Sequence, residues 1–256
     1  MQRTLMMWLC VCITTIMSCK ESQDSTVGNR YVNEEVTSYS TYPEVYGVKS
    51  VTEQVANLRD LFPEIKDATF DEKLASSPLP QYAEGWFAIP RWQVLASTYG
   101  LAVQKVLATI QSKRSFYNYR EGSLGEEFLR PHEHTTSMLK ILANQQAGHN
   151  ILIIPVQFGL LHRGQSVRRA REVFQSNEFG LGSFQVGIML LTHPERLVQW
   201  DQLHLDCAGD EYAPGADGVF CHAPLFLFHG GGLGFIAYPC GHAGGGFGSV
   251  SGFLPQ

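Results

Sequence analysis

Four arginines and no acidic residue occupy the segment from His162 to Arg171. Ser166 is placed to begin a helix there, because serine is a preferred helix N-cap. The amide groups at a helix N-terminus carry partial positive charge, so basic side chains in the first turn are unfavourable unless an anion lies beside them. The pattern therefore predicts a site for a phosphate, carboxylate or sulfate. The expected ligand-binding residues are Arg163, Gly164, Ser166, Arg168 and Arg169, with Arg171 close by.

Two alternatives for this segment stay open. Glu172, Glu178 or an acid from elsewhere could pair with the arginines, since arginine is the usual cation in ion-pair networks. In that case no external anion is needed. The order Gly-Gln-Ser-Val-Arg also lacks the final glycine of the Gly-x-Ser-x-Gly nucleophile elbow. Ser166 is therefore expected to cap a helix and not to act as a nucleophile.

A second group of candidate residues is acidic and lies between Asp201 and Asp217, a stretch without lysine or arginine. Alternation around Leu205 predicts a strand with His204 and Asp206 on one face, followed by a turn. Carboxylates and an imidazole gathered there could bind a divalent metal or act as acid and base. The candidate catalytic residues are His204, Asp206, Asp210 and Glu211, and the candidate metal ligands are Asp206, Asp210, Glu211 and His222. Their spacing matches no EF-hand or zinc signature, so solvated turn acids are the alternative.

The elements that would position these residues follow from apolar periodicity. Pro224 disfavours an interior strand and is expected at an edge or a bulge. The glycine-rich end, 229–256, is expected to be rich in turns, and 63–90 is expected to be an irregular connection. Helices are predicted over 51–62, 91–114, 135–147, 166–175 and a short stretch from Pro194, strands over 151–158, 203–206 and 219–228, and either a helix or a strand over 183–191. This order predicts an α+β or α/β fold, as a single globular domain with a mixed sheet spanning 47–256.

The first 46 residues have a different character. Residues 5–17 are uncharged and follow Arg3, a length typical of a signal-peptide core and short of the roughly 20 residues of a membrane span. The run ends in Ile-Met-Ser-Cys19, which resembles the lipobox of bacterial lipoproteins. This resemblance implies that residues 1–18 are a signal peptide and that Cys19 is lipidated, giving a membrane-anchored protein of the cell envelope. Residues 19–46 are polar and are expected to form a flexible tether. An uncleaved N-terminus on a cytoplasmic protein is the alternative.

Composition excludes several classes of protein. With 44% apolar and 17% charged residues, the chain is not globally disordered. Nineteen basic against 24 acidic residues give a net charge of −5, which argues against general nucleic-acid binding. Outside the signal segment and Cys19, the cysteines are Cys207, Cys221 and Cys240, whose pairing the sequence leaves open.

Three functions are compatible with these patterns. The first is a lipid-anchored protein that binds an anionic small molecule or a glycan at the arginine segment without catalysis. The second is a metal-assisted hydrolase in which the acidic residues hold a metal ion and the arginines hold a phosphate or carboxylate substrate. The third is a structural envelope protein that acts through contacts with partners. Whether the protein is an enzyme stays open at this stage.

Overall fold

The apolar run after residue 150 forms strand β4 (Ile151–Gln157) in the computed structural model, which describes residues 29–255. All seven of its residues are buried, as predicted. It pairs antiparallel with β1 (Gly85–Pro90) and with β11 (Ser251–Phe253), and β11 also pairs with β5 (Glu178–Gly180). The result is a four-stranded antiparallel sheet in the order β1-β4-β11-β5. Strand β1 lies in the stretch 63–90 that was predicted to be irregular. The prediction was wrong because all six residues of this short strand are buried, so no alternation of apolar and polar residues marks it.

A second, seven-stranded sheet contains the remaining strands of the described residues. Its longest members are β8 (His222–His229) and β9 (Gly232–Pro239), which pair antiparallel over their whole length. The others are β2 (Phe116–Asn118), β3 (Leu129–Pro131), β6 (His204–Asp206), β7 (Asp210–Tyr212) and β10 (Phe247–Ser249). The β10–β6 and β2–β9 pairs are parallel and the rest antiparallel, so the sheet is mixed, as predicted. The glycine-rich end therefore holds three strands, not turns alone.

Pro224 corrects a second expectation, because it lies inside β8 and not at an edge. On one side β8 is paired with β9, where Pro224 faces Ala237. On the other side its partner changes, since Leu225 pairs with β6 and His222 pairs with β7. The missing N–H falls at this change of partner, while the Pro224 carbonyl still accepts a hydrogen bond from the Cys207 amide.

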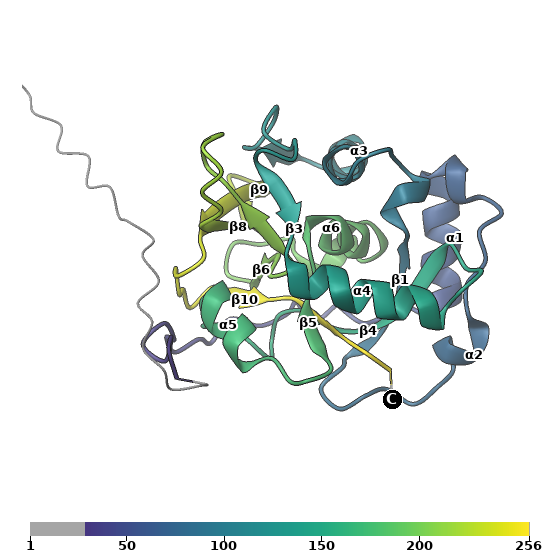
Figure 1. Cartoon of the computed structure of the whole chain (residues 1–256), viewed down its shortest axis with the longest axis horizontal. Helices are drawn as coiled ribbons and strands as arrows, with labels where there is room; N and C mark the ends of the chain where they lie inside the picture. Colours follow the sequence, from purple (N-terminus) through teal and green to yellow (C-terminus); the bar gives the residue numbers. More distant parts are fainter. Residues whose placement is uncertain (1–28, 256) are drawn as a thin grey trace, which may run out of the picture.

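Five helices of at least seven residues in the described chain cover the sheets (Figure 1). They are α1 (Val51–Leu61), α3 (Tyr99–Lys113), α4 (Glu133–Gln145), α5 (Val167–Val173) and α6 (Ser183–Thr192), and shorter turns are α2 (Glu72–Ala75) and the 3-10 segments Pro63–Ile65, Trp92–Val94 and Pro194–Arg196. Helix α6 is buried on nearly every face and packs against α1, α3 and β1. Helix α3 begins at Tyr99, later than predicted, because the Thr98 side chain caps it. Within residues 29–255, no helix is both long and apolar enough to cross a bilayer.

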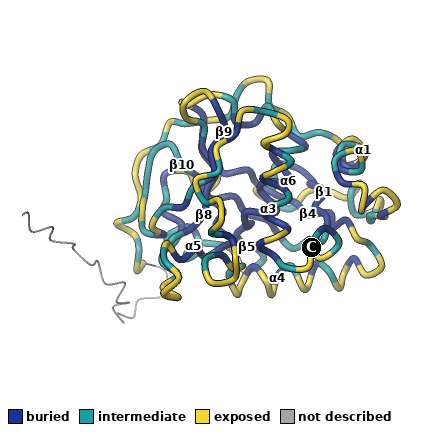
Figure 2. Tube along the Cα trace, turned by 90° about the horizontal axis from the view of Figure 1, so that it is seen from above, coloured by how far each residue is buried: buried dark blue, intermediate teal, exposed yellow. Residues whose placement is uncertain are grey.

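One hydrophobic core joins both sheets and the central helices, so the described chain is a single α+β domain (Figure 2). Phe87 on β1, Ile154 on β4, Phe184 on α6 and Phe226 on β8 all belong to it. The predicted fold class is confirmed. Burial of this shared apolar surface is the main force that holds the two sheets together.

The described part of the expected tether packs against the domain. The Val36 amide donates to the Gly164 carbonyl, and the Tyr42 hydroxyl donates to Glu84. The Arg196 guanidinium lies 3.8 Å from the Tyr42 ring centroid. The aromatic residues and glutamates of this polar segment therefore fix it to the surface. Residues 1–28, including the signal segment, Cys19 and the start of the tether, lie outside the described residues.

Candidate functional site

The arginine segment forms helix α5, with Ser166 as its N-cap, as predicted. The anion at this helix end comes from the chain itself. Glu34 accepts a hydrogen bond from the Ser166 hydroxyl and forms an ion pair with Arg168. Its carboxylate therefore occupies the position predicted for an external ligand.

The other arginines also have partners within the chain. Arg169 pairs with Glu35 and, at 2.9 Å, with Glu172. Arg171 donates to the backbone carbonyls of Ala208 and Asp210, and the Arg163 guanidinium donates to that of Ser40. Gly164 has a φ of 79°, and a Cβ there would meet the Val36 carbonyl, so this glycine serves the docking of the N-terminal segment. The geometry thus favours the internal-pairing interpretation of this segment.

The acidic group divides between the two faces of the sheet. Asp210 is fully buried on the side of α6, where it accepts hydrogen bonds from the Tyr99 hydroxyl (2.7 Å) and the Ser183 amide (2.6 Å). Burial raises the pKa of Asp210 to about 6, although these hydrogen bonds oppose the shift. Asp210 therefore anchors the start of α6 and is not available to a substrate.

The predicted metal ligands do not come together. Glu211 pairs with Arg130 on the neighbouring strand at 2.8 Å, and His222 lies at the start of β8 next to Cys221. In residues 29–255, no group of three or more histidine, cysteine, aspartate or glutamate side chains could hold a metal ion. The metal-assisted hydrolase has no ligand set in the described chain.

His204 and Asp206 do share one face of β6, as the alternation predicted, and it is the face opposite the core residue Leu205. Asp206 is 6% exposed, and no described residue forms a hydrogen bond or an ion pair with its carboxyl group. Burial alone raises its pKa to about 7. Burial lowers the pKa of His204 to about 4, although the Trp200 backbone opposes this shift. At neutral pH the imidazole is therefore uncharged.

Aromatic rings gather over this face. The His204 ring lies 5.2 Å from Phe247 and 5.3 Å from Trp200, and Phe247 lies 6.0 Å from Tyr238 and 5.8 Å from His242. We call these five residues the aromatic patch. No sequence pattern indicates it, because its members come from three separate strands and the loops beside them.

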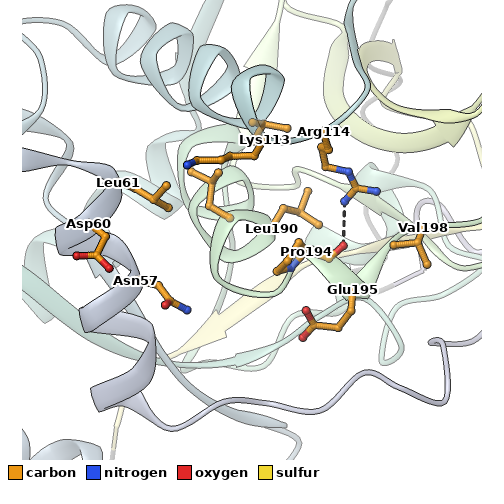
Figure 3. A pocket seen from close by; sticks show the side chains of 11 residues that line it. Asn57, Asp60, Leu61, Lys113, Arg114, Leu190, Pro194, Glu195 and Val198 are labelled. Carbon is orange, nitrogen blue, oxygen red and sulfur yellow. Dashed lines mark hydrogen bonds between the residues drawn. The ribbon is translucent and has the colours of Figure 1, made fainter.

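A cavity of about 580 Å³ lies on the opposite, helical side, between α1, α3 and α6 (Figure 3). We call it the helical cavity. This volume is in the range of small-molecule sites. Its apolar residues are Leu61, Ile110, Leu190, Leu191, Pro194 and Val198, and its polar residues are Asn57, Asp60, Lys113, Arg114 and Glu195.

Some of the charged residues around the helical cavity have partners in the described chain, and others have none. Arg114 donates to the carbonyls of Pro194 (2.9 Å) and Leu197 (2.8 Å), and burial lowers its pKa. Glu195 pairs with Lys49 at 3.3 Å. Within the described part of the chain, Lys113 and Asp60 form no ion pair. Two cations at the end of α3 thus lie beside the apolar floor without a carboxylate partner.

A second hollow, of about 680 Å³, lies at the start of α4 and is lined mainly by polar residues. His132 caps that helix, and burial lowers its pKa to about 4. His134 contacts the Glu178 carbonyl at 3.0 Å, and Arg130 pairs with Glu211. His134 and Arg130 thus have partners within the chain, and Glu133 and Ser137 complete the polar lining of the hollow.

The residues of the helical cavity are not among those predicted from the sequence. Leu61, Ile110 and Leu190 look only like core positions of three helices, and nothing in their spacing shows that the helices leave a gap. No known family, curated protein or solved structure shows significant similarity to the chain. The argument about ligand binding therefore depends on the geometry alone.

Proposed function

We propose that the chain is a lipid-anchored binding protein of the bacterial cell envelope that holds a small amphipathic carboxylate in the helical cavity. The anchor follows from the lipobox resemblance at Cys19. The ligand class keeps the anionic small molecule expected from the sequence but moves it away from α5. The observation that carries the proposal is an apolar cavity with Lys113 and Arg114 at its rim and no carboxylate paired with either one in residues 29–255.

The cavity has an apolar part and a charged rim, and each would bind one end of such a ligand. An aliphatic or aromatic group would cover Leu61, Ile110 and Leu190, and burying it contributes about 0.8 kcal/mol per methylene. The carboxylate would meet the Lys113 ammonium, which lies at the C-terminal end of α3 where a ligand can reach it. Asp60, on the far side of the cavity in Figure 3, would repel a second carboxylate and so disfavour dicarboxylates.

Calorimetric titration of the full-length chain with octanoate tests the proposal. We expect saturable binding that weakens by about two- to fivefold in Lys113→Gln, as expected for loss of one exposed ion pair. The control Lys140→Gln, on the exposed face of α4, should bind as the wild type does. Val198→Trp should block the cavity, whereas Val219→Trp, at an exposed loop position, should not. Equal binding by octanol and octanoate, or unchanged binding in both cavity variants, would refute the site.

A further inference from the structure

Two of the three cysteines in residues 29–255 lie opposite each other beside neighbouring strands. In the antiparallel pair of β8 and β9, His222 lies beside Pro239, so the same register places Cys221, just before β8, opposite Cys240, just after β9. The Cys240 amide donates a hydrogen bond of 2.9 Å to the Cys221 carbonyl, so the pairing extends this far. The two cysteines are therefore direct cross-strand neighbours.

The spacing of this pair suits a disulfide. Cα atoms of a hydrogen-bonded antiparallel pair are about 5.5 Å apart, and disulfides join residues whose Cα atoms are about 4.4–6.8 Å apart. Burial and, to a lesser extent, the nearby Cys221 thiol raise the pKa of Cys240 to about 11. The two sulfurs therefore lie close enough for a charge on one to act on the other.

The third cysteine, Cys207, lies apart from this pair. It is fully buried in the main hydrophobic core. Cys240 belongs instead to a small separate cluster with Val167 of α5 and Ala223 of β8. Ala223 is two residues from Cys221 and projects from the same face of the sheet, because alternate residues of a strand share a face. Cys221 and Cys240 are thus on one face of the second sheet, and Cys207 is on the face toward the main core.

The structure assigns Cys221 and Cys240 as a disulfide pair that forms by exchange with a disulfide donor and leaves Cys207 as a thiol. Register and sheet face together select this pair from the three pairings that the sequence leaves open. Disulfides persist in oxidising compartments, which include the surface and periplasm of bacteria. The pair shares no residue with the helical cavity, so this inference does not depend on the ligand proposed for that cavity.

The surroundings of Cys221 suit it to react first with the donor. Cys221 is half-buried, and its sulfur lies 3.2 Å from Nδ1 of His222. Burial lowers the pKa of His222, so at neutral pH the imidazole is uncharged and can accept the thiol proton. The Cys221 thiolate then attacks one sulfur of the donor. A mixed disulfide forms, and the other donor sulfur leaves as a thiol.

Cys240 completes the exchange. It is 7% exposed, and with a pKa of about 11 it is protonated at neutral pH, so the donor reacts at Cys221 before it reacts here. Arg171 and Arg168 oppose the rise in the Cys240 pKa and therefore favour its thiolate when the proton leaves. The Cys240 sulfur attacks the Cys221 sulfur and releases the second donor sulfur as a thiol. In total the two cysteines lose two electrons and two protons, and the donor disulfide is reduced to two thiols.

Peptide mapping of the purified full-length chain tests the pairing. The chain is equilibrated with oxidised glutathione, alkylated under denaturing conditions, digested and analysed by mass spectrometry. Chymotrypsin is the protease of choice, because the sequence has no lysine or arginine after Arg196, whereas Phe226 separates the two cysteines. We expect Cys221 and Cys240 to lose alkylation together and to appear in one linked pair of peptides. Cys207 should be fully alkylated.

Single variants separate the roles of the two sulfurs. Cys240→Ala should stop at a glutathione adduct on Cys221, whereas Cys221→Ser should leave Cys240 without an adduct and open to alkylation. The control Cys207→Ala should form the same linked pair as the wild type. The wild-type map identifies the pair by itself, so misfolding of a variant cannot conceal it.

Three results would overturn the assignment. The first is a link from Cys221 or Cys240 to any other cysteine. The second is full alkylation of both residues in the oxidised wild type. The third is a glutathione adduct that persists on wild-type Cys221, because Cys240 would then be out of reach of the mixed disulfide.

Discussion

Glu34 reaches the N-terminus of helix α5 from 132 residues away and accepts a hydrogen bond from the Ser166 hydroxyl. The same carboxylate pairs with Arg168. One side chain thus satisfies the helix end, the capping serine and a cation, and it fixes the N-terminal segment to the domain.

Replacing this carboxylate should loosen the segment and destabilise the domain. We expect Glu34→Gln to lower the free energy of unfolding by about 1–3 kcal/mol, because hydrogen bonds to charged groups are lost at a partly buried position. Urea denaturation measures this change. Glu44→Gln, at an exposed position of the same segment, is the control and should have little effect. Equal stability of the two variants would show that the segment is not held by Glu34.

The buried carboxyl of Asp206 should make stability depend on pH. Its pKa in the folded protein, about 7, is above the ordinary value of 3.8, so the folded state binds more protons than the unfolded state between about pH 4 and 7. Stability from this group is therefore present below pH 4 and is lost as the pH rises to about 7, by up to roughly 4 kcal/mol.

Asp206→Asn isolates this contribution, because the lowered pKa values of the histidines are the same in both proteins at each pH. We expect the variant to match the wild type at pH 4 and to exceed its stability by up to about 4 kcal/mol at pH 8. Denaturation at both pH values gives the two differences. A variant that is less stable than the wild type at pH 8 would mean that a cation already neutralises Asp206.

Gly180 on β5 should tolerate no side chain. A Cβ at this position would lie 2.4 Å from the carbonyl carbon of Ala208, which is backbone and cannot move aside. We expect Gly180→Ala to lower the free energy of unfolding by about 1–3 kcal/mol, as overpacking does in other cores. Gly215→Ala is the matched control, since its nearest contact would be an ordinary 3.9 Å. Thermal unfolding of both variants checks the difference.

Lipidation at Cys19 is tested by intact-mass spectrometry after expression of the full-length chain in a bacterial host. We expect loss of residues 1–18 and gain of acyl chains, and neither change in Cys19→Ala. An unprocessed wild-type chain would contradict the envelope location. The helical cavity would then face a cytoplasmic pool of ligands.

Periodicity predicted most helices and the buried strand β4, because a regular apolar stripe is typical of a helix and a continuous apolar run is typical of a buried strand. It could not show β1, whose run from Trp86 to Ile89 is too short to be diagnostic. Periodicity also could not predict the role of Glu34. A glutamate in a polar segment is typical of a linker, and its partner Ser166 is 132 residues away in the sequence.

The candidate sites likewise divide into features that local sequence patterns predict and features that depend on tertiary packing. The alternation of Leu203 to Asp206 placed His204 and Asp206 on one face, and the structure agrees. The rings above them depend on how β9 and β10 are arranged around β6, and the helical cavity depends on how α1, α3 and α6 fail to close. Both are properties of tertiary packing, which single-sequence patterns do not contain.

The position of β11 between β4 and β5 has a consequence for the growing chain. Strand β4 is synthesised well before its neighbour β11, which is made only when the ribosome reaches residues 251–253. Until then one edge of a strand whose first six residues are apolar stays open, and open edges of this kind promote association between chains. The first sheet is therefore completed only after residues 251–253 are made, and the edge of β4 that β11 covers stays exposed in the nascent domain until then.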